Sequence, residues 1–160
     1  MPKPQISETE FDTTFDRDWL SVFRFALAWT NDWSAAEDLT QDAFTRLWVN
    51  RDRLDWTQPL LPWLLTTTRR LATDRFRRLR RLVVPLRNEV QLGGDPDSDA
   101  RIRWMDLQPR LDRLSRTERS ALVLTAVVGL SSEDSAEALG TTAGAVRAAV
   151  SRARTNLDDK

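Results

Sequence analysis

Apolar residues recur every three or four positions along most of this chain, which is the spacing of one face of an α-helix. The first such stretch predicts a helix over residues 11–30. Its apolar positions are Phe15, Trp19, Val22, Phe23, Ala26 and Leu27. After a short turn, Ser34 and Glu37 have the spacing of a capping box, which predicts a second helix running to about Arg53. We expect its buried face to consist of Ala36, Leu39, Ala43, Phe44, Leu47 and Trp48.

The third helical stretch is distinctive because it combines an apolar face with a row of arginines. Residues 62–82 read PWLLTTTRRLATDRFRRLRRL, and Pro62 suits the first turn of a helix. The residues expected on the buried side are Leu61, Leu64, Leu65, Leu71, Ala72, Phe76, Leu79 and Leu82. The opposite side has Trp63, Thr67, Arg70, Asp74, Arg77 and Arg81. The pattern therefore predicts one buried face and one cationic face with an aromatic residue at its N-terminal end.

A change of composition then separates the chain into two helical parts. Residues 85–100 contain two prolines and a glycine pair without a sustained apolar period, which is typical of a linker. Helical spacing of apolar residues returns at Ile102. We therefore expect an all-α fold with two small helical domains. The expected division is a disordered N-terminus over 1–10, a first domain over 11–84, a flexible linker over 85–103 and a second domain over 104–160.

Capping signals mark the helices of the second domain. Ser115 and Glu118 form another capping box, and the helix that follows ends at Gly129, in the position of a C-cap. Its VLTAVV segment also fits a short buried strand, but the capping signals at both ends favour a helix. Two further helices are predicted, one from Ser131 or Ser132 to Leu139 with Gly140 after it, and one from Thr141 or Thr142 to about Leu157.

The last two helices have the spacing of a helix-turn-helix, with a turn over residues 140–142. The side chains expected to point inward from the second helix are Val146, Val150, Ala153 and Leu157. Those expected to face outward are Thr142, Gly144, Arg147, Ala148, Ser151, Arg152 and Arg154. Arg147 lies where a side chain reaches base edges in the DNA major groove, and Arg152 and Arg154 suit phosphates. A plain helical hairpin fits the same spacing equally well.

The residue types that are missing narrow the possible functions. The 160 residues include no cysteine and no histidine. Disulfides, zinc sites with Cys or His ligands, and His-based acid–base catalysis are therefore excluded. No nucleophile with a neighbouring base is visible, so we expect no enzymatic activity, no metal and no cofactor. No apolar run approaches the length of a membrane span, and the first residues do not resemble a signal peptide.

Charge is distributed unevenly although the formal net charge is zero. Residues 1–55 contain six basic and eleven acidic side chains, whereas residues 56–87 contain eight arginines and one aspartate. Guanidinium groups pair with phosphates, and a neighbouring aromatic ring can stack on an unpaired base, so the basic helix indicates a nucleic-acid partner. A solvated arginine-rich helix is the alternative interpretation. Two differently charged surfaces suggest two different partners.

The second predicted helix has a polar face that can contact a partner protein. Asp38, Gln41, Asp42 and Thr45 lie at positions i, i+3, i+4 and i+7, opposite much of the apolar face. Carboxylates and an amide on a stiff helix accept hydrogen bonds from Arg or Lys of another protein. From spacing alone, a solvated face near a helix N-terminus is the favoured explanation of these residues.

Taken together, three segments resemble the extracytoplasmic-function sigma factors of the sigma-70 family. AEDLTQDAFTRLW resembles the family segment AEDLVQEVFLRLW, which binds the β′ subunit of RNA polymerase. PWLLTTTRRLATDRFRR resembles AWLLTIARNLAIDHLRR, which melts and reads the promoter −10 element. LDRLSRTERSALVLTAVVGLSSEDSAEALGTTAGAVRAAVSRARTNL resembles the family's −35-binding domain. The resemblance covers about 15–157 and implies a bacterial, cytoplasmic transcription initiation factor.

The resemblance also implies roles for individual residues. The implied contacts to polymerase are Asp38, Gln41, Asp42 and Phe44. The implied −10 contacts are Asp55, Trp56, Thr57, Trp63, Thr67, Arg70, Asp74 and Arg77, and the implied −35 contacts are Thr142, Gly144, Arg147, Ala148, Ser151, Arg152 and Arg154. The implied partners are core RNA polymerase, through its β′ and β subunits, and promoter DNA. Many members are held inactive by an anti-sigma factor, and the sequence leaves open whether this chain has one.

Four residues depart from the family pattern. Arg70 stands where the family usually has asparagine, so base capture at −10 is expected to differ. Ser135 replaces a core isoleucine, and Ala148 and Ala149 replace a Ser-Arg pair of the recognition helix, so we expect weak or unusual −35 binding. The alternative function is a helix-turn-helix regulator that binds duplex DNA alone, as a dimer, without polymerase.

Overall fold

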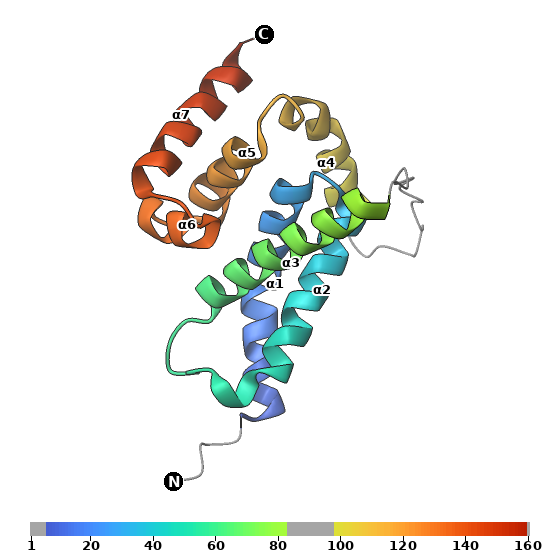
Figure 1. The fold of residues 1–160 in the computed structure, drawn as a ribbon, viewed down its shortest axis with the longest axis vertical. Helices are drawn as coiled ribbons and strands as arrows, with labels where there is room; N and C mark the ends of the chain where they lie inside the picture. The colour runs from blue at the N-terminus through green and yellow to red at the C-terminus, as the bar shows by residue number, and fades with distance from the viewer. Residues whose placement is uncertain (1–5, 83–97, 160) are drawn as a thin grey trace.

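The computed structural model shows a chain built from helices, as the sequence predicts (Figure 1). The structure describes residues 6–82 and 98–159, and no strand occurs within these two ranges. The elements in chain order are α1 (Glu8–Thr30), α2 (Trp33–Val49), the 3₁₀ turn η1 (Arg51–Arg53), α3 (Leu61–Leu82), α4 (Ser98–Leu111), α5 (Arg116–Leu122), the π-helical turn η2 (Val123–Val128), α6 (Ser132–Leu139) and α7 (Ala143–Asp158).

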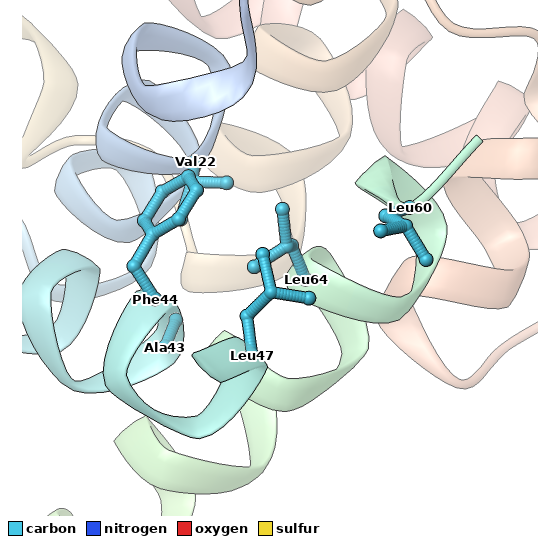
Figure 2. Close-up of a cluster of buried hydrophobic side chains, with 6 residues drawn as sticks. All are labelled: Val22, Ala43, Phe44, Leu47, Leu60 and Leu64. Carbon is cyan, nitrogen blue, oxygen red and sulfur yellow. The ribbon is translucent and has the colours of Figure 1, made fainter. Parts of the chain in front are cut away.

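The first three helices pack around one apolar core. Helices α1, α2 and α3 all contact one another. Figure 2 shows part of this core, where side chains from the three helices and from the loop before α3 lie close together. Its buried members are Val22, Ala43, Phe44, Leu47, Leu60 and Leu64. Each large apolar side chain stabilises the fold by about 1.5–3 kcal/mol when fully buried, so this core fixes the arginine-rich α3 on its neighbours.

The start of α2 differs from the prediction. The N-cap is Asp32, whose carboxylate accepts a hydrogen bond from the Ala35 amide at 2.9 Å. Glu37 does not close a capping box but accepts a hydrogen bond from the Trp33 indole Nε1 at 2.8 Å. The capping box predicted at Ser34 is therefore wrong. An aspartate caps a helix as well as a serine does, and here it stands two residues earlier.

Other element boundaries also differ from the prediction. Helix α1 begins at Glu8, after a capping box at Ser7, so residues 8–10 are helical rather than part of a disordered terminus. Helix α2 ends at Val49, and a 3₁₀ turn follows it. Residues 98–103, expected to belong to the linker, form the first turns of α4. The rest of the predicted linker lies outside the described residues.

The apolar face of α3 is buried along only part of its length. Leu64, Leu65 and Ala72 are buried, as predicted. Phe76 and Leu82 are 45% and 65% exposed, so the expectation that they lie in the core is wrong. Helical spacing shows which side of a helix a residue faces, but it does not show whether another element covers that side.

The C-terminal helices follow their capping signals closely. The capping box at Ser115 opens α5. Ser131 and Thr142 are the N-caps of α6 and α7, which resolves both alternatives in the sequence. Gly129 and Gly140 end their helices with φ angles of 85° and 66°, a left-handed conformation that glycine adopts without steric cost.

The VLTAVV segment is helical rather than a strand, but its hydrogen bonding is that of a π-helix over Val123–Val128. The backbone amide of Leu130 closes this turn by donating to the Leu124 carbonyl at 2.9 Å. Leu124 is buried, whereas Val127 is 52% exposed. The wider turn changes which residues of the segment face the first three helices.

The C-terminal helices pack directly against the first three (Figure 1). Helix α5 and η2 contact α1, and α6 contacts α3. The centre of this contact is apolar and buried, and it consists of Phe25, Leu65, Leu124 and Ala138. We call this contact the junction. It joins two parts of the chain that the sequence pattern predicts as separate domains.

Candidate nucleic-acid and protein interfaces

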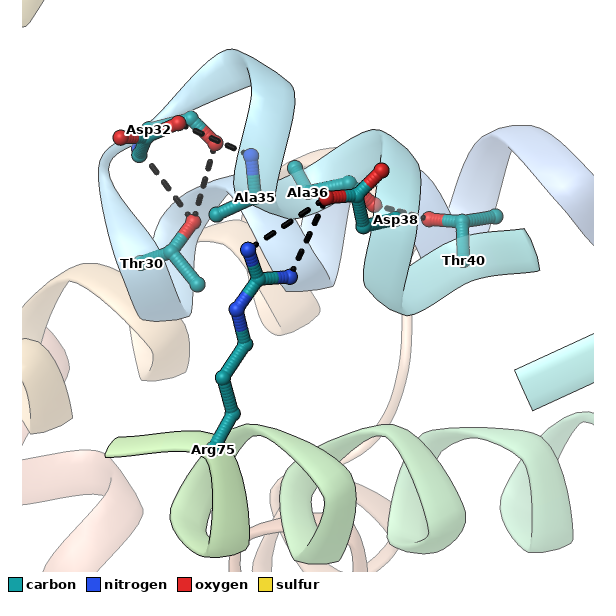
Figure 3. A network of polar contacts seen from close by, with 7 residues as sticks. All are labelled: Thr30, Asp32, Ala35, Ala36, Asp38, Thr40 and Arg75. Atoms are coloured by element: carbon teal, nitrogen blue, oxygen red, sulfur yellow. Dashed lines mark hydrogen bonds and ion pairs between the residues drawn. The ribbon is translucent and has the colours of Figure 1, made fainter. Parts of the chain in front are cut away.

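The polar face of α2 is exposed. Asp38, Gln41, Asp42 and Thr45 all lie at the surface. Figure 3 shows the Asp38 carboxylate reaching the Arg75 guanidinium of α3, with an N–O distance of 3.3 Å. The Arg75 side chain is 41% exposed and the Asp38 side chain 60%, and ion pairs so open to solvent contribute about 0–1 kcal/mol. The pair therefore leaves the α2 face free to exchange Arg75 for a cationic group of a partner.

Phe44 lies beneath this polar face rather than on it. It is 3% exposed and belongs to the core of the first three helices. Its ring packs against Phe15, with centroids 4.8 Å apart, and against Phe11 at 6.5 Å. In this conformation Phe44 is buried too deeply for the direct polymerase contact implied by the resemblance. It supports the helix that presents the acidic residues.

The loop before α3 is held in place by its own polar groups. The Asp55 carboxylate accepts hydrogen bonds from the Thr57 amide at 3.0 Å and the Thr57 hydroxyl at 2.6 Å, as in an Asx turn. The Trp56 indole Nε1 donates to the Arg51 carbonyl at 2.9 Å. These bonds hold three predicted site residues in one defined arrangement.

Trp56 lies between two surface hollows. One has a volume of about 420 Å³ and is lined by Ile6, Glu10, Arg51, Asp52, Arg53, Leu54, Asp55, Trp56 and Thr57. The other, of about 440 Å³, is lined by Thr14, Arg17, Trp56, Thr57, Gln58, Pro59 and Leu60. The arginines in these linings were not among the predicted site residues. For Arg51 and Arg53 the signal in the sequence is weak, namely an Arg-Asp-Arg triplet directly before the loop.

The predicted cationic face of α3 is exposed over most of its length. Arg70, Asp74 and Arg77 lie at the surface, whereas Trp63 and Thr67 are half-buried. Trp63 packs partly against the core of the first three helices, so its ring both supports α3 and reaches the surface. The structure therefore orders the five residues in one row, from a partly covered aromatic to exposed arginines.

A groove joins the α2 face to α3. It has a volume of about 650 Å³, and Asp42 of α2 and Asp74 of α3 both line it, together with Arg75 and Arg78. The predicted polymerase-binding and −10 surfaces are therefore neighbours on one side of the molecule. The predicted −35 residues lie apart from them, on the last helix.

Helix α7 presents the outward residues that the sequence predicts. Gly144, Arg147, Ala148, Ser151, Arg152 and Arg154 are exposed, and Val146, Ala149 and Ala153 are buried. Thr142 is exposed, and its hydroxyl caps the helix by accepting from the Ala145 amide at 3.2 Å. Val150 and Leu157 are half-buried. The side that a DNA groove would meet thus combines three arginines with the small residues Gly144, Ala148 and Ser151.

Two of the α7 arginines are paired with acids of their own half. Arg147 lies 3.6 Å from the Glu133 carboxylate of α6. Arg152 lies 3.5 Å from Glu118, whose carboxylate also closes the capping box of α5. DNA phosphates would have to compete with these carboxylates. The Arg147–Glu133 pair competes less strongly with DNA phosphates than the Arg152–Glu118 pair, because both of its side chains are well exposed.

Two features are absent from the described part of the chain. Within residues 6–82 and 98–159, no group of three acidic side chains could hold a metal ion. None of the helices in these ranges is long and apolar enough to cross a membrane.

Comparisons with known proteins identify the family. Residues 20–82 match the family described as Sigma-70 region 2, and residues 105–157 match Sigma-70, region 4. The sigma factor EcfG of Rhodopseudomonas palustris is 30% identical over 139 residues, which span 86% of this chain and 77% of the relative. The sigma factor SigC of Mycobacterium tuberculosis is 32% identical over 139 residues, spanning 85% of this chain and 75% of the relative.

Solved structures agree with these matches. The sigma factor RpoE, solved in complex with the anti-sigma factor NepR from Bartonella quintana, is 26% identical with a TM-score of 0.74, over 94% of this chain and 96% of that chain. CnrH in complex with the cytosolic domain of CnrY has a TM-score of 0.67 at 24% identity, over 94% of this chain and 86% of that chain, and supports the fold alone. The chain therefore belongs to the extracytoplasmic-function sigma factors of the sigma-70 family, which direct RNA polymerase to promoters and initiate transcription.

Proposed function

We propose that each of the two matched regions recognises a different promoter element. A first domain over 11–84 binds core polymerase and the −10 element, and a second domain over 104–160 binds the −35 element. Residues 85–103 connect them. The support is that one acidic surface and two arginine-bearing surfaces lie on three different helices, α2, α3 and α7. The chain acts in the bacterial cytoplasm without catalysis of its own.

The polymerase contact is assigned to the exposed face of α2. Asp38, Gln41 and Asp42 project from a helix that is buried on its other side, so their positions are fixed before a partner arrives. Their exposed carboxylate and amide groups complement Arg and Lys side chains. Phe44 is given a supporting role because it is buried.

The −10 contact is assigned to α3 and the loop before it. The observations in its favour are a row of exposed arginines on a packed helix and, in the loop before that helix, Trp56 with two hollows large enough for an unpaired base. Guanidinium groups attract the phosphates, and the cost of unpairing a base is offset when it enters a hollow beside an aromatic ring. Arg70 and Arg77 are assigned to the DNA phosphate backbone, and Trp63 is assigned to the edge of the melted duplex.

The −35 contact is assigned to α7, with Arg147 nearest the bases and Arg152 and Arg154 toward phosphates. The small side chains Gly144 and Ala148 permit close approach of the helix to the groove but offer no hydrogen bonds. We therefore expect this contact to add less specificity than the −10 contact does. An anti-sigma factor is a further proposed partner, because the solved relative RpoE was captured with the anti-sigma factor NepR.

The polymerase assignment is tested by a double substitution on α2. Gln41→Ala with Asp42→Ala should lower the affinity for sigma-free core polymerase at least tenfold, measured by competition with a labelled housekeeping sigma factor. The matched control is Asp12→Ala with Asp16→Ala, which changes exposed acids on α1. Circular dichroism should show both variants folded. Equal competition by the two double variants would remove the α2 face from the polymerase interface.

A further inference from the structure

Helix α1 holds a carboxylate that is almost completely removed from solvent. Asp18 is 5% exposed as a residue, and its side chain is 7% exposed. A buried carboxylate is costly unless a cation and hydrogen bonds compensate for the lost water. The compensating group is Arg17, whose Nε donates to Oδ1 of Asp18 at 3.1 Å and whose Nη2 donates to Oδ2 at 3.0 Å. The two side chains therefore form a bidentate pair.

The pair holds the Arg17 side chain in place although 57% of that side chain is exposed. Adjacent residues of a helix point in different directions, so the arginine has to bend along the helix surface to reach Asp18. The hydrogen bonds and the charge of Asp18 raise the pKa of the Arg17 guanidinium above its ordinary value. Ordering a long side chain costs conformational entropy, and here that cost is met before a partner binds.

One edge of the Arg17 guanidinium is not used by Asp18. A guanidinium has five N–H groups, and the pair with Asp18 uses one on Nε and one on Nη2. The edge between Nη1 and Nη2 still has two roughly parallel N–H groups. Two parallel donors are best matched by a ligand with two acceptors side by side.

Arg17 lines the hollow of about 440 Å³ that Trp56 also lines. Two further lining residues, Thr14 and Leu60, are each 5% exposed, and Leu60 belongs to the core of the first three helices. The hollow therefore extends from the surface down to packed side chains. It combines an aromatic residue with a cation whose position is fixed, which suits a flat base that has two neighbouring acceptors.

Guanine is the base that fits these donors best. Its O6 and N7 accept side by side and are the most common specific partners of arginine in DNA complexes. On the same edge, adenine and cytosine each have an amino donor, and thymine has a methyl group. An unpaired cytosine has adjacent acceptors on its pairing edge, but guanine has the larger face for stacking on an indole ring.

We propose that Arg17, oriented by Asp18, selects an unpaired guanine of the −10 element in the hollow lined by Trp56. This inference rests on the proposed −10 function of the loop before α3, and it names the base and the residue that contacts it. Asp18 is a positioning residue because it acts only through the arginine. A bidentate arginine–guanine pair discriminates against other bases by about fivefold to 150-fold.

A substitution that keeps the positive charge but removes the paired donors tests this assignment. Arg17→Lys still places a cation beside Asp18, whereas a lysine ammonium does not match two acceptors in one plane. Holoenzyme assembled from the chain and sigma-free core polymerase selects ligands from single-stranded DNA of random sequence, and the bound molecules are sequenced. The wild-type chain should enrich guanine at one position by at least about fivefold, and Arg17→Lys by less than about twofold.

The matched control is Arg24→Lys. Arg24 is an exposed arginine about two turns further along α1, and it does not line this hollow. This variant should keep the wild-type guanine enrichment. Both lysine variants should leave the preferences at other positions of the selected sequence unchanged, and circular dichroism should show both folded.

A modified base tests the contact at the level of single atoms. In 7-deazaguanine a C–H group replaces N7, so one of the two acceptors is lost. With this base in the selected sequence, wild-type holoenzyme should bind at least about fivefold more weakly, and Arg17→Lys holoenzyme should bind both forms equally. Asp18→Asn should lower the guanine enrichment as well. If Arg17 only neutralised Asp18, these variants would change Tm but not the base preference.

Three results would overturn the proposal. They are equal guanine enrichment in Arg17→Lys and Arg24→Lys, a base other than guanine at the position that responds to Arg17→Lys, and equal binding of guanine and 7-deazaguanine by wild-type holoenzyme. Unchanged enrichment in Asp18→Asn would overturn the positioning role of Asp18. Failure of the proposed function has a different signature, because wild-type holoenzyme would then select no sequence beyond those that core polymerase selects alone.

Discussion

The buried hydroxyl of Ser135 has no hydrogen-bond partner, so the effect of removing it on the free energy of unfolding can be predicted. The residue lies in α6 and is 0% exposed, and its Oγ has no hydrogen bond. Leaving a buried hydroxyl unpaired costs about 1–3 kcal/mol, and alanine removes the hydroxyl with little change in shape. Alanine also favours a helix interior slightly more than serine does. Ser135→Ala should therefore raise the free energy of unfolding by about 1–2 kcal/mol.

The assay is thermal and urea unfolding followed by circular dichroism. For a chain of this size, about 1 kcal/mol corresponds to about 2–4 °C in Tm, so an increase of a few degrees is expected. Ser120→Ala should act in the same direction, because its buried hydroxyl is also unpartnered. Ser131→Ala is the matched control in the same helix. It removes the N-cap bond to the Asp134 amide at 3.0 Å and should lower stability by about 1 kcal/mol.

A destabilised Ser135→Ala variant would refute this reasoning. The hydroxyl would then have a partner in solution, and the departure from the family's isoleucine would be a polar contact rather than an unpaired group. The same variants also bear on −35 binding. If the unpaired hydroxyl loosens the helix-turn-helix, Ser135→Ala should strengthen binding of holoenzyme to a promoter that depends on its −35 element.

Two further substitutions test the −10 assignment and the start of α2. Arg77→Ala should weaken promoter opening and flatten its salt dependence by about 0.7–0.9 in log–log slope per lost phosphate contact, whereas Arg103→Ala, an exposed arginine of α4, should leave the slope unchanged. An unaltered slope for Arg77→Ala would show that Arg77 does not contact DNA. Asp32→Ala should destabilise the fold by about 1 kcal/mol in urea unfolding, and Ser34→Ala by much less, because Asp32 makes the cap. A larger loss of stability for Ser34→Ala than for Asp32→Ala would support the capping box that the sequence predicts at Ser34.

Much of the fold follows from local signals in the sequence. The apolar spacing within each helix, the capping box at Ser115 and the glycines at 129 and 140 act over one or two turns, so they can be recognised without tertiary structure. The outward face of α7 follows from the same spacing. The polar face of α2 is predicted correctly for this reason, although its function is supported by family resemblance.

The features that the sequence hides depend on distant partners. Arg69 looks like one more arginine of a basic helix, yet it caps α6 across the junction. Phe76 has the spacing of a core residue, yet no helix covers it fully. Phe44 lies on the border between the two faces of α2, and the nearby rings of Phe11 and Phe15 bury it. In each case the deciding neighbour is remote in sequence, so helical spacing cannot reveal it.

The most direct test of the account is transcription in vitro with sigma-free core polymerase, with start sites mapped on genomic DNA. We expect the chain to direct initiation from a small set of sites that share a −10 element, and core polymerase alone to initiate from none of them. If the chain instead binds duplex DNA by itself and leaves the start sites of polymerase unchanged, the sigma-factor account is contradicted and a stand-alone regulator takes its place.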